Sequence, residues 1–293
     1  MGVSGLLLLD KPSGPTSHDM VAVIRRGARE KRVGHAGTLD PLATGLLVVC
    51  LGAATRLSEY LLEKDKRYQA RVRFGQATNT YDADGTITAT SEALPTREQV
   101  EAALAQFRGL IRQRPPAFSA IKRGGQKAYE LARRGETVEL EPRPITIYQL
   151  QLIEWSPPEC VLEVHCMAGT YIRSLAHDLG QALGCGAHLT ALRRTASGRF
   201  LVKQAVALEA LNAAFAAGDW ERVLLPMDAA LPDWPTVRLS AEGERRIRTG
   251  QAVPLESTGG EWAKACDASG KFFAVLRADT SARVWRPHKV LID

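Results

Sequence analysis

Residues 34–51 are GHAGTLDPLATGLLVVCL, a loop around one carboxylate that leads directly into an apolar strand. Pro41 fixes its own φ angle and pushes Asp40 toward an extended conformation. Gly37 and Gly45 permit backbone angles that other residues resist. Such a loop holds one acid in a set direction and leaves room for the backbone of another molecule. An Asx-type turn, in which Asp40 bonds its own backbone, is the alternative for this stretch.

The segments before the loop predict one strand and one helix. Residues 5–9 form a short apolar run that ends at the turn residues 10–15, which indicates a buried strand. Thr16 or Ser17 is a good N-cap for a helix that extends to about Gly27.

The segments after the loop alternate between the two kinds of structure. Residues 66–74 place Tyr68 and the other apolar residues on one side and charged residues on the other, which predicts a half-buried strand. Helices are expected near 55–62, 96–107, 127–134 and 171–183, a turn at 82–85, a Pro-interrupted edge segment at 112–122, and a hairpin of strands 144–155 and 160–167. Mixed helices and strands with prominent hairpins indicate the α+β class.

Length and composition limit the remaining possibilities. A chain of 293 residues forms one large domain or two smaller ones, and three prolines between Leu225 and Pro235 place a boundary there. The last part, with a helix at 241–249 and strands around 267–270, predicts a small β-rich module. There is no apolar run of about 18 residues for a membrane span and no signal peptide at the N-terminus. The five cysteines are scattered and form no C-x-x-C pair, which argues against disulfides and structural zinc and fits a reducing cytoplasm.

Basic residues occur in clusters. The formal net charge of +6 makes nucleic acid a plausible partner. Solvated helix faces are the alternative, but one cluster adjoins the Asp40 loop, so we expect at least one to bind phosphate. The clusters are Arg25, Arg26, Arg29, Lys31 and Arg32; Lys122, Arg123, Lys127, Arg133 and Arg134; and Arg193, Arg194 and Arg199.

A few residues could carry chemistry. Arg173 lies in the first turn of a predicted helix, where a cation opposes the helix dipole at a cost of about 0.3–1 kcal/mol. Asp40 or an RNA phosphate would offset this cost, and exposure to solvent is the alternative. Taken alone, Tyr68 is more typical of ordinary core and His35 of polar surface. The sequence has no Walker loop, GxGxxG fingerprint or nucleophile elbow, which disfavours phosphate-transfer and nicotinamide enzymes.

Five blocks together resemble the bacterial tRNA pseudouridine-55 synthases of the TruB family. They follow the family's order at similar spacing, and the similarity extends from about Leu6 to Phe200. The blocks are residues 34–41 (GHAGTLDP), 66–68 (KRY), 114–122 (RPPAFSAIK), 169–174 (GTYIRS) and 192–195 (LRRT).

The resemblance implies that uridine 55 in the T-loop of tRNA is isomerised to pseudouridine by base flipping, without a cofactor or a metal. Asp40 matches the catalytic aspartate, Arg173 the arginine that pairs with it, and Tyr68 the tyrosine that stacks on the target base. Lys11, with Pro12, matches a motif that supports the Asp40 loop. The residues expected to bind substrate are His35, Tyr171, Leu192 and Lys11.

The same resemblance implies a pseudouridine synthase fold, with a mixed, mainly antiparallel central sheet flanked by helices. We expect a catalytic domain at 1–232, a thumb-like segment at about 112–143, and a small PUA-like RNA-binding domain at 236–293. Phe118 and Arg56 stand where tyrosine and lysine are common, and they keep the stacking or charge character. We expect a cytoplasmic monomer that acts on the T-stem loop of tRNA. It is expected neither to bind a membrane nor to need a protein partner. The alternatives are an RNA-binding or tRNA-folding module, and a guide-dependent synthase.

Overall fold

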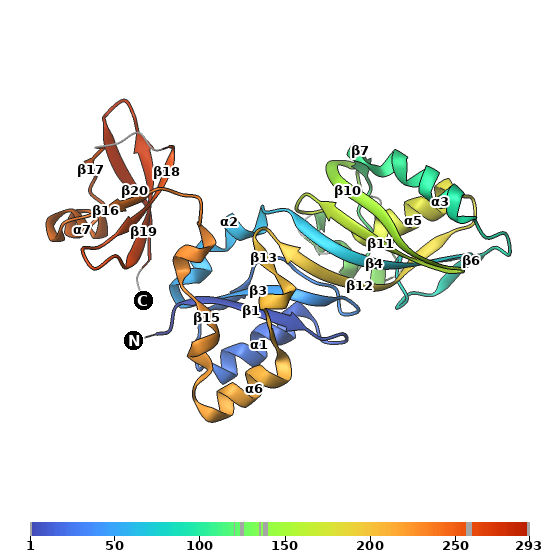
Figure 1. The fold of residues 1–293 in the computed structure, drawn as a ribbon, viewed down its shortest axis with the longest axis horizontal. Helices are drawn as coiled ribbons and strands as arrows, with labels where there is room; N and C mark the ends of the chain where they lie inside the picture. Colours follow the sequence, from blue (N-terminus) through green and yellow to red (C-terminus); the bar gives the residue numbers. More distant parts are fainter. Residues whose placement is uncertain are drawn as a thin grey trace.

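The protein is seen in a computed structural model that describes residues 2–119, 121–123, 126–134, 136, 140–255 and 260–291. Within these residues the chain forms an eleven-stranded sheet, a five-stranded sheet and two small ladders (Figure 1). The large sheet uses strands from residues 5–225, and the five-stranded sheet uses strands from residues 236–290.

The large sheet is mixed and mainly antiparallel, as predicted. Its order is β14–β1–β3–β12–β4–β11–β10–β7, and β1–β14 and β3–β12 are parallel pairs. Strands β2, β13 and β15 pair with β3, β12 and β1 at its margins. The strands are β1 (Gly5–Lys11), β2 (Val33–His35), β3 (Thr44–Leu51), β4 (Lys66–Phe74), β7 (Gly109–Gln113), β10 (Arg143–Ser156), β11 (Glu159–Cys166), β12 (Ala187–Ser197), β13 (Phe200–Leu201), β14 (Val206–Ala207) and β15 (Leu224–Leu225).

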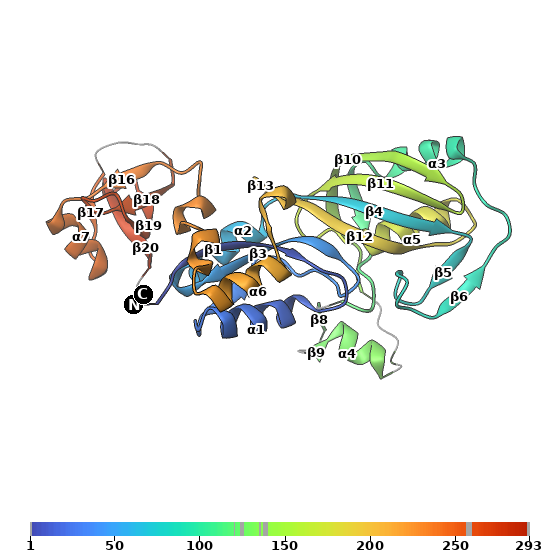
Figure 2. The same cartoon turned by 60° about the horizontal axis from the view of Figure 1, so that its bottom comes forward.

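Helices cover the two halves of this sheet separately. Helices α1 (Ser17–Gly27) and α6 (Leu208–Ala217) pack together and cover β1 and β3, while α3 (Arg97–Leu104) and α5 (Ile172–Ala182) pack on the β4–β10 half (Figure 2). Thr16 caps α1 in a capping box with Asp19, which confirms the predicted helix start. The shorter elements are α2 (Ser58–Leu62), α4 (Ala128–Arg133), β5 (Gln76–Thr78), β6 (Ile87–Thr90), β8 (Lys122–Arg123) and β9 (Gln126–Lys127).

The second sheet shares apolar packing with the first. Phe272, Val275 and Leu291 belong to the same buried cluster as Leu6 and Leu8 of β1. The order of this sheet is β16–β18–β19–β20–β17. Its elements are β16 (Thr236–Arg238), α7 (Ala241–Arg248), β17 (Val253–Pro254), β18 (Trp262–Cys266), β19 (Phe272–Asp279) and β20 (Val284–Val290).

Most elements lie where the sequence pattern predicted them, and two differ. The expected 55–62 helix is a 3₁₀ segment, Gly52–Leu57, followed by the single turn of α2. The edge strand β7 ends at Gln113 and does not extend to 122. Pro115 and Pro116 follow it, and proline supplies no N–H to continue the β7–β10 ladder.

The two halves of the large sheet meet at β3 and β12. Thr44 pairs with Arg193 and Gly45 with Arg194. Gly45 has a φ of +96°, and a Cβ there would lie 2.4 Å from the carbonyl oxygen of Arg194. The position therefore needs glycine for its backbone angle and for the close approach of β12.

We predict that Gly45→Ala destabilises the fold through both effects. The strained angle and the overlap together should lower the free energy of unfolding by about 3 kcal/mol or more, measured by urea denaturation. Gly14→Ala is the matched control, because Gly14 has a φ of +105° and a Cβ added there would meet no atom within 4 Å. It should cost about 1–2 kcal/mol. Equal losses in the two variants would contradict the role of the β3–β12 contact.

Candidate active site

Asp40 and Arg173 form an ion pair at the centre of the candidate site. Asp40 lies in the loop between β2 and β3, and Arg173 in the first turn of α5. Arg173 Nε lies 2.9 Å from Asp40 Oδ2, and its Nη2 donates to Oδ1 at 3.2 Å. The Asp40 side chain is 36% exposed and that of Arg173 only 7%. The acid is thus held by a buried cation and still open to a ligand.

The Asp40 loop is not an Asx-type turn among the contacts that the structure describes. The backbone closes the turn, because Ala43 N–H donates to the Asp40 carbonyl at 3.1 Å, while the carboxylate accepts from Arg173. The solvent-exposed alternative for Arg173 is also wrong.

Arg173 also joins two further segments, the turn at Thr80–Asp82 and the backbone at Phe118. Its Nη1 lies 3.3 Å from Asp82 Oδ2 and donates to the Thr80 carbonyl at 3.2 Å. Its Nη2 donates to the Phe118 carbonyl at 3.0 Å. From the sequence, Asp82 is expected only in a turn, since nothing local shows that this turn lies against α5. Asp82 is therefore a site residue that the sequence reasoning missed.

Gln113 fixes the start of α5. Its side-chain amide donates to the Tyr171 carbonyl at 2.9 Å, and its side-chain oxygen accepts from Tyr171 N–H at 2.8 Å. This contact satisfies a backbone N–H at the helix N-terminus that has no partner within the helix. Arg173 then emerges from a helix start anchored on the edge strand β7. The sequence offers no local signal for this role of Gln113.

Two buried cations hold the Asp40 loop through its backbone carbonyls. Lys11 Nζ donates to the carbonyls of Pro12, Pro41 and Ala43 at 2.8, 3.2 and 2.7 Å. Arg194 donates to the carbonyls of Leu46, Gly37 and Thr38 at 2.7, 3.0 and 3.4 Å. Lys11 is completely buried, and these contacts agree with the expectation that it supports the Asp40 loop, while its part in binding substrate stays a prediction. Its three donors are used on the loop, and it supports the backbone around Asp40.

The three basic clusters differ in their surroundings. The residues of the first, at the end of α1, are all exposed. In the second, Lys122, Arg123, Lys127 and Arg133 have side chains outside the described part, and exposed Arg134 pairs with Glu136 at 3.2 Å. In the third, Arg194 is buried and Arg193 forms a two-pronged pair with Asp10 at 3.1 and 2.7 Å. Structural contacts therefore occupy Arg193 and Arg194, whereas Arg199 of the same cluster is exposed.

Burial is the largest influence on the pKa of the Asp40 carboxyl. Loss of hydration raises the pKa of its carboxyl above the ordinary value, and the charge of Asp82 adds to this rise. Arg173 and Lys11 oppose the rise because they stabilise the carboxylate. Asp40 is thus a stronger base than an exposed aspartate, and its ionised form is directed by a guanidinium.

Tyr68 lies near enough to this carboxylate to be influenced by its charge, and Leu192 is buried in the same apolar cluster as Tyr68. They belong to the same face of neighbouring strands, since Leu192 pairs with Ala70 and Arg194 with Tyr68. Tyr68 is buried, and burial together with the Asp40 charge raises the pKa of its hydroxyl, while Arg194 acts in the opposite direction. The Asp40 carboxylate and the Tyr68 hydroxyl therefore influence each other electrostatically.

His35 and Tyr171 complete the set of predicted residues. His35 ends β2 and is half-buried, and its Nδ1 has no hydrogen-bond partner within the described structure. Burial lowers the pKa of His35, with a smaller contribution from Arg194. Tyr171 precedes α5, and the Arg143 guanidinium lies 5.0 Å from the centre of its ring.

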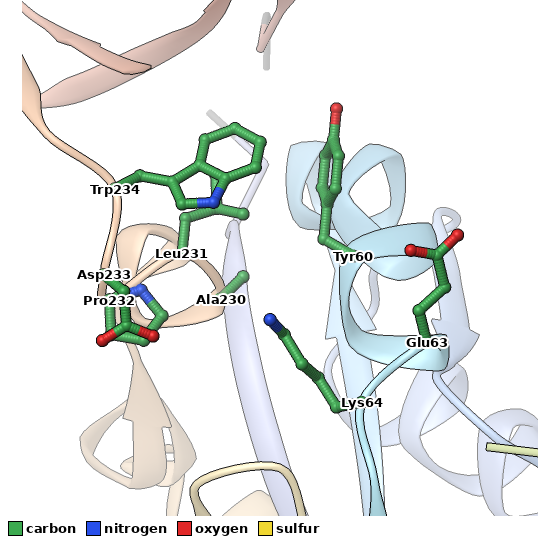
Figure 3. Close-up of a pocket in the computed structure, with 8 residues that line it drawn as sticks. All are labelled: Tyr60, Glu63, Lys64, Ala230, Leu231, Pro232, Asp233 and Trp234. Carbon is green, nitrogen blue, oxygen red and sulfur yellow. The ribbon is translucent and has the colours of Figure 1, made fainter. Parts of the chain in front are cut away.

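Two hollows lie outside the Asp40–Arg173 contact. One of about 250 Å³ lies between α2 and residues 230–234, where the Lys64 amine points inward between Tyr60 and Trp234, and none of its lining residues is a predicted site residue (Figure 3). Another of about 380 Å³ is lined by Gln69 and Arg71, which face away from Tyr68 on β4. Leu42 of the Asp40 loop, Thr44 at the start of β3 and the predicted site residue Leu192 also line it.

The described residues contain no cluster of three or more histidine, cysteine or acidic side chains that could hold a metal ion. All five cysteines are buried free thiols. Among the helices assigned here, none is long and apolar enough to cross a membrane.

We predict that Asp82→Asn lowers the pKa of the Asp40 carboxyl, because it removes the neighbouring negative charge and leaves Arg173 to a single carboxylate. A ¹³C NMR titration of aspartate carboxyl carbons measures this shift, with the Asp40 signal assigned by its loss in Asp40→Asn. Asp84→Asn, an exposed change in the same turn, is the control and should leave the pKa of Asp40 where it is. An unchanged or higher pKa in Asp82→Asn would show that the network is wrongly described.

Comparisons with known proteins show the family of this chain. Residues 25–172 match the N-terminal domain model of the TruB family pseudouridylate synthases, and residues 173–232 match the C-terminal domain model of tRNA pseudouridylate synthase B. The tRNA pseudouridine synthase B of Pseudomonas paraeruginosa is 43% identical over 286 residues, which are 96% of this chain and 94% of that protein. That of Haemophilus influenzae is 47% identical over 254 residues, which are 86% of this chain and 81% of that protein.

Solved structures show the same fold. An H/ACA RNP bound to a substrate RNA containing 2′-deoxyuridine has a chain with a TM-score of 0.74 and 25% identity, covering 99% of this chain and 85% of that one. A Cbf5-Nop10-Gar1 complex has a chain with a TM-score of 0.73 and 28% identity, and the match covers 98% of this chain and 85% of that one. By its family-model matches and its identity to these relatives, the chain belongs to the TruB family of pseudouridylate synthases.

Proposed function

We propose that this protein isomerises uridine 55 in the T-loop of tRNA to pseudouridine. The observation that carries the proposal is the Asp40–Arg173 pair, with a partly exposed carboxylate on a buried guanidinium beside Tyr68. The relatives named tRNA pseudouridine synthase B support tRNA as the substrate. In the reaction the C1′–N1 bond breaks, the uracil rotates and C5 bonds to C1′. C5 loses a proton and N1 gains one, so the overall reaction neither gains nor loses atoms.

Asp40 acts in its ionised form. It attacks C1′ of the ribose or removes a proton at C2′, and both routes need a carboxylate aimed at the sugar. Arg173 fixes that direction. The raised pKa of Asp40 makes it more basic, and the acid is still ionised when the surrounding pH exceeds that pKa.

Tyr68 and Leu192 form the surface against which the flipped base lies. Both are largely buried, so they present apolar area to a planar ring at little cost in side-chain freedom. The Tyr68 hydroxyl lies in the field of Asp40 and can exchange a proton with the base. Flipping costs a few kcal/mol, and less for a loop base than for a paired one. We assign His35 to the space that the displaced nucleotides leave, and Tyr171 to contact with the nucleotide.

Exposed cations supply the RNA contacts outside the site. The cluster at the end of α1 is exposed, and its chain continues into β2 and the Asp40 loop. Contacts of lysine and arginine with phosphates make affinity fall as salt rises. We assign the residues 112–143 to a thumb that closes on the RNA, and 236–293 to a PUA-like RNA-binding domain after the catalytic domain 1–232.

The isomerisation is redox-neutral, so the proposal requires no cofactor. We propose that the protein acts as a monomer in the cytoplasm, without an obligate protein partner. This arrangement differs from the Cbf5-Nop10-Gar1 complex, whose chain resembles this one in fold.

Replacing the catalytic acid tests the assignment. We predict that Asp40→Asn lowers pseudouridine formation by at least about 10³-fold, because the reaction loses its ionised group. Binding of tRNA should change little. Product is measured by pseudouridine sequencing of treated tRNA, and binding by filter retention. Comparable product formation by Asp40→Asn would refute the role of Asp40. Refolding of tRNA by the same variant separates a folding activity from catalysis.

The need for a guide RNA can be tested directly, since the fold also resembles the chain of an H/ACA RNP. We predict that the purified protein alone converts a bare T-stem-loop RNA, because its own residues supply the acid, the guanidinium and the base platform. The product is detected as before, with Asp40→Asn as the inactive control. A guide-dependent synthase would be supported if the purified protein converted neither the stem-loop nor whole tRNA, while cell extract that contains the protein converted them.

A further inference from the structure

The turn that contains Asp82 adopts a costly backbone conformation. It connects β5 to β6, and Tyr81 has a φ of +66°. This left-handed region is unfavourable for a bulky residue, and surrounding contacts must compensate for it. Backbone bonds anchor one side of the turn on β12, because Leu189 N–H donates to the Tyr81 carbonyl at 3.0 Å and Ala83 N–H to the Leu189 carbonyl at 2.9 Å.

A ring stack anchors the other side of the turn on α5. The rings of Tyr81 and His177 lie 3.8 Å apart between centroids and are inclined by 14°. His177 follows Arg173 by four residues, so both side chains leave the same face of the helix. The turn and α5 are thereby joined at two adjacent points, the stack and the Asp82–Arg173 ion pair.

Tyr81 lies between the two residues of the turn that bind Arg173. Thr80 offers its carbonyl to Nη1, and Asp82 offers Oδ2 to the same nitrogen. The other oxygen of Asp82 is occupied, since Oδ1 accepts from the Thr80 hydroxyl at 2.5 Å and from Asp84 N–H at 3.2 Å. A shift of Tyr81 would therefore displace both acceptors together.

The surroundings favour a neutral ring at position 177. Burial lowers the pKa of His177, and its Nδ1 is buried without a hydrogen-bond partner among the described residues. A neutral imidazole stacks on a phenol without placing a further cation beside Arg173. Asp178 and Arg114 lie near enough to influence the Tyr81 hydroxyl, and their charges have opposite signs.

We propose that Tyr81 and His177 form a positioning pair for the reaction. Their stack holds the Asp82 turn against α5, so that Thr80 and Asp82 orient Arg173, and Arg173 orients Asp40. Neither ring touches the reacting atoms, and both act through the guanidinium. The kinetic part of the inference rests on the proposed function.

Four variants test the pair. His177→Ala removes the stack, whereas His177→Phe keeps a flat ring. Tyr81→Asn removes the ring and keeps a residue that tolerates a positive φ. Gln181→Ala changes an exposed residue of the same helix and serves as the control.

We expect His177→Ala and Tyr81→Asn each to lower kcat by about 10- to 100-fold, because a small displacement of a catalytic group is costly. KM for tRNA should stay within about twofold of the parent value, since neither ring is among the residues assigned above to RNA contact. His177→Phe should recover kcat to within about threefold of the parent. The double variant should be no slower than the slower single variant, because both changes break one contact. Gln181→Ala should behave as the parent.

A measurement without substrate separates this inference from the proposed function. In His177→Ala the Asp82 carboxylate moves away from Arg173 and Asp40, so the pKa of Asp40, followed by ¹³C NMR, should fall toward the value in Asp82→Asn. In His177→Phe it should return to the parent value. A parent protein without synthase activity would refute the function but leave this titration valid. An unchanged Asp40 titration in His177→Ala, or no rescue of that titration by phenylalanine, would overturn the positioning role.

Discussion

One buried guanidinium organises the candidate site. Burying a charge is costly unless it is paired and hydrogen-bonded, so Arg173 must find partners at every face of its fork. It finds them in three separate places, the loop of Asp40, the turn of Asp82 and the backbone at Phe118. These segments are far apart in the sequence, and their common contact is a side chain at the start of α5. The arrangement of the site is therefore a consequence of satisfying Arg173.

The loop that carries the acid is constrained in a complementary way. Lys11 and Arg194 together donate to six backbone carbonyls around it. A loop backbone that leaves regular structure must satisfy its polar groups elsewhere, and here two cations do so. Of the two, Lys11 opposes the rise in the pKa of Asp40 that burial causes. The same contacts give rigidity and electrostatic compensation.

The sequence predicted the local features well. Alternation over Lys66–Phe74, the Thr16 cap and the strands on either side of residues 156–158 were sufficient for β4, α1 and the β10–β11 hairpin. The dipole argument also placed Arg173 near an anion. The misses are long-range, because Gln113 and Asp82 take their roles from Tyr171 and Arg173, which are distant in the sequence. No local pattern reveals such partners, so a site aspartate looked like an ordinary turn residue.

The apolar cluster between the two sheets has a consequence for substrate choice. Phe272, Val275 and Leu291 are buried with Leu6 and Leu8, so the C-terminal module cannot swing away without exposing apolar surface to water. The separation between that module and Asp40 is then a nearly constant length. A folded RNA that touches both must present its two contact points at that spacing. The protein would thus select an RNA by the spacing of two contact points on a folded molecule. A short sequence motif alone does not define that spacing.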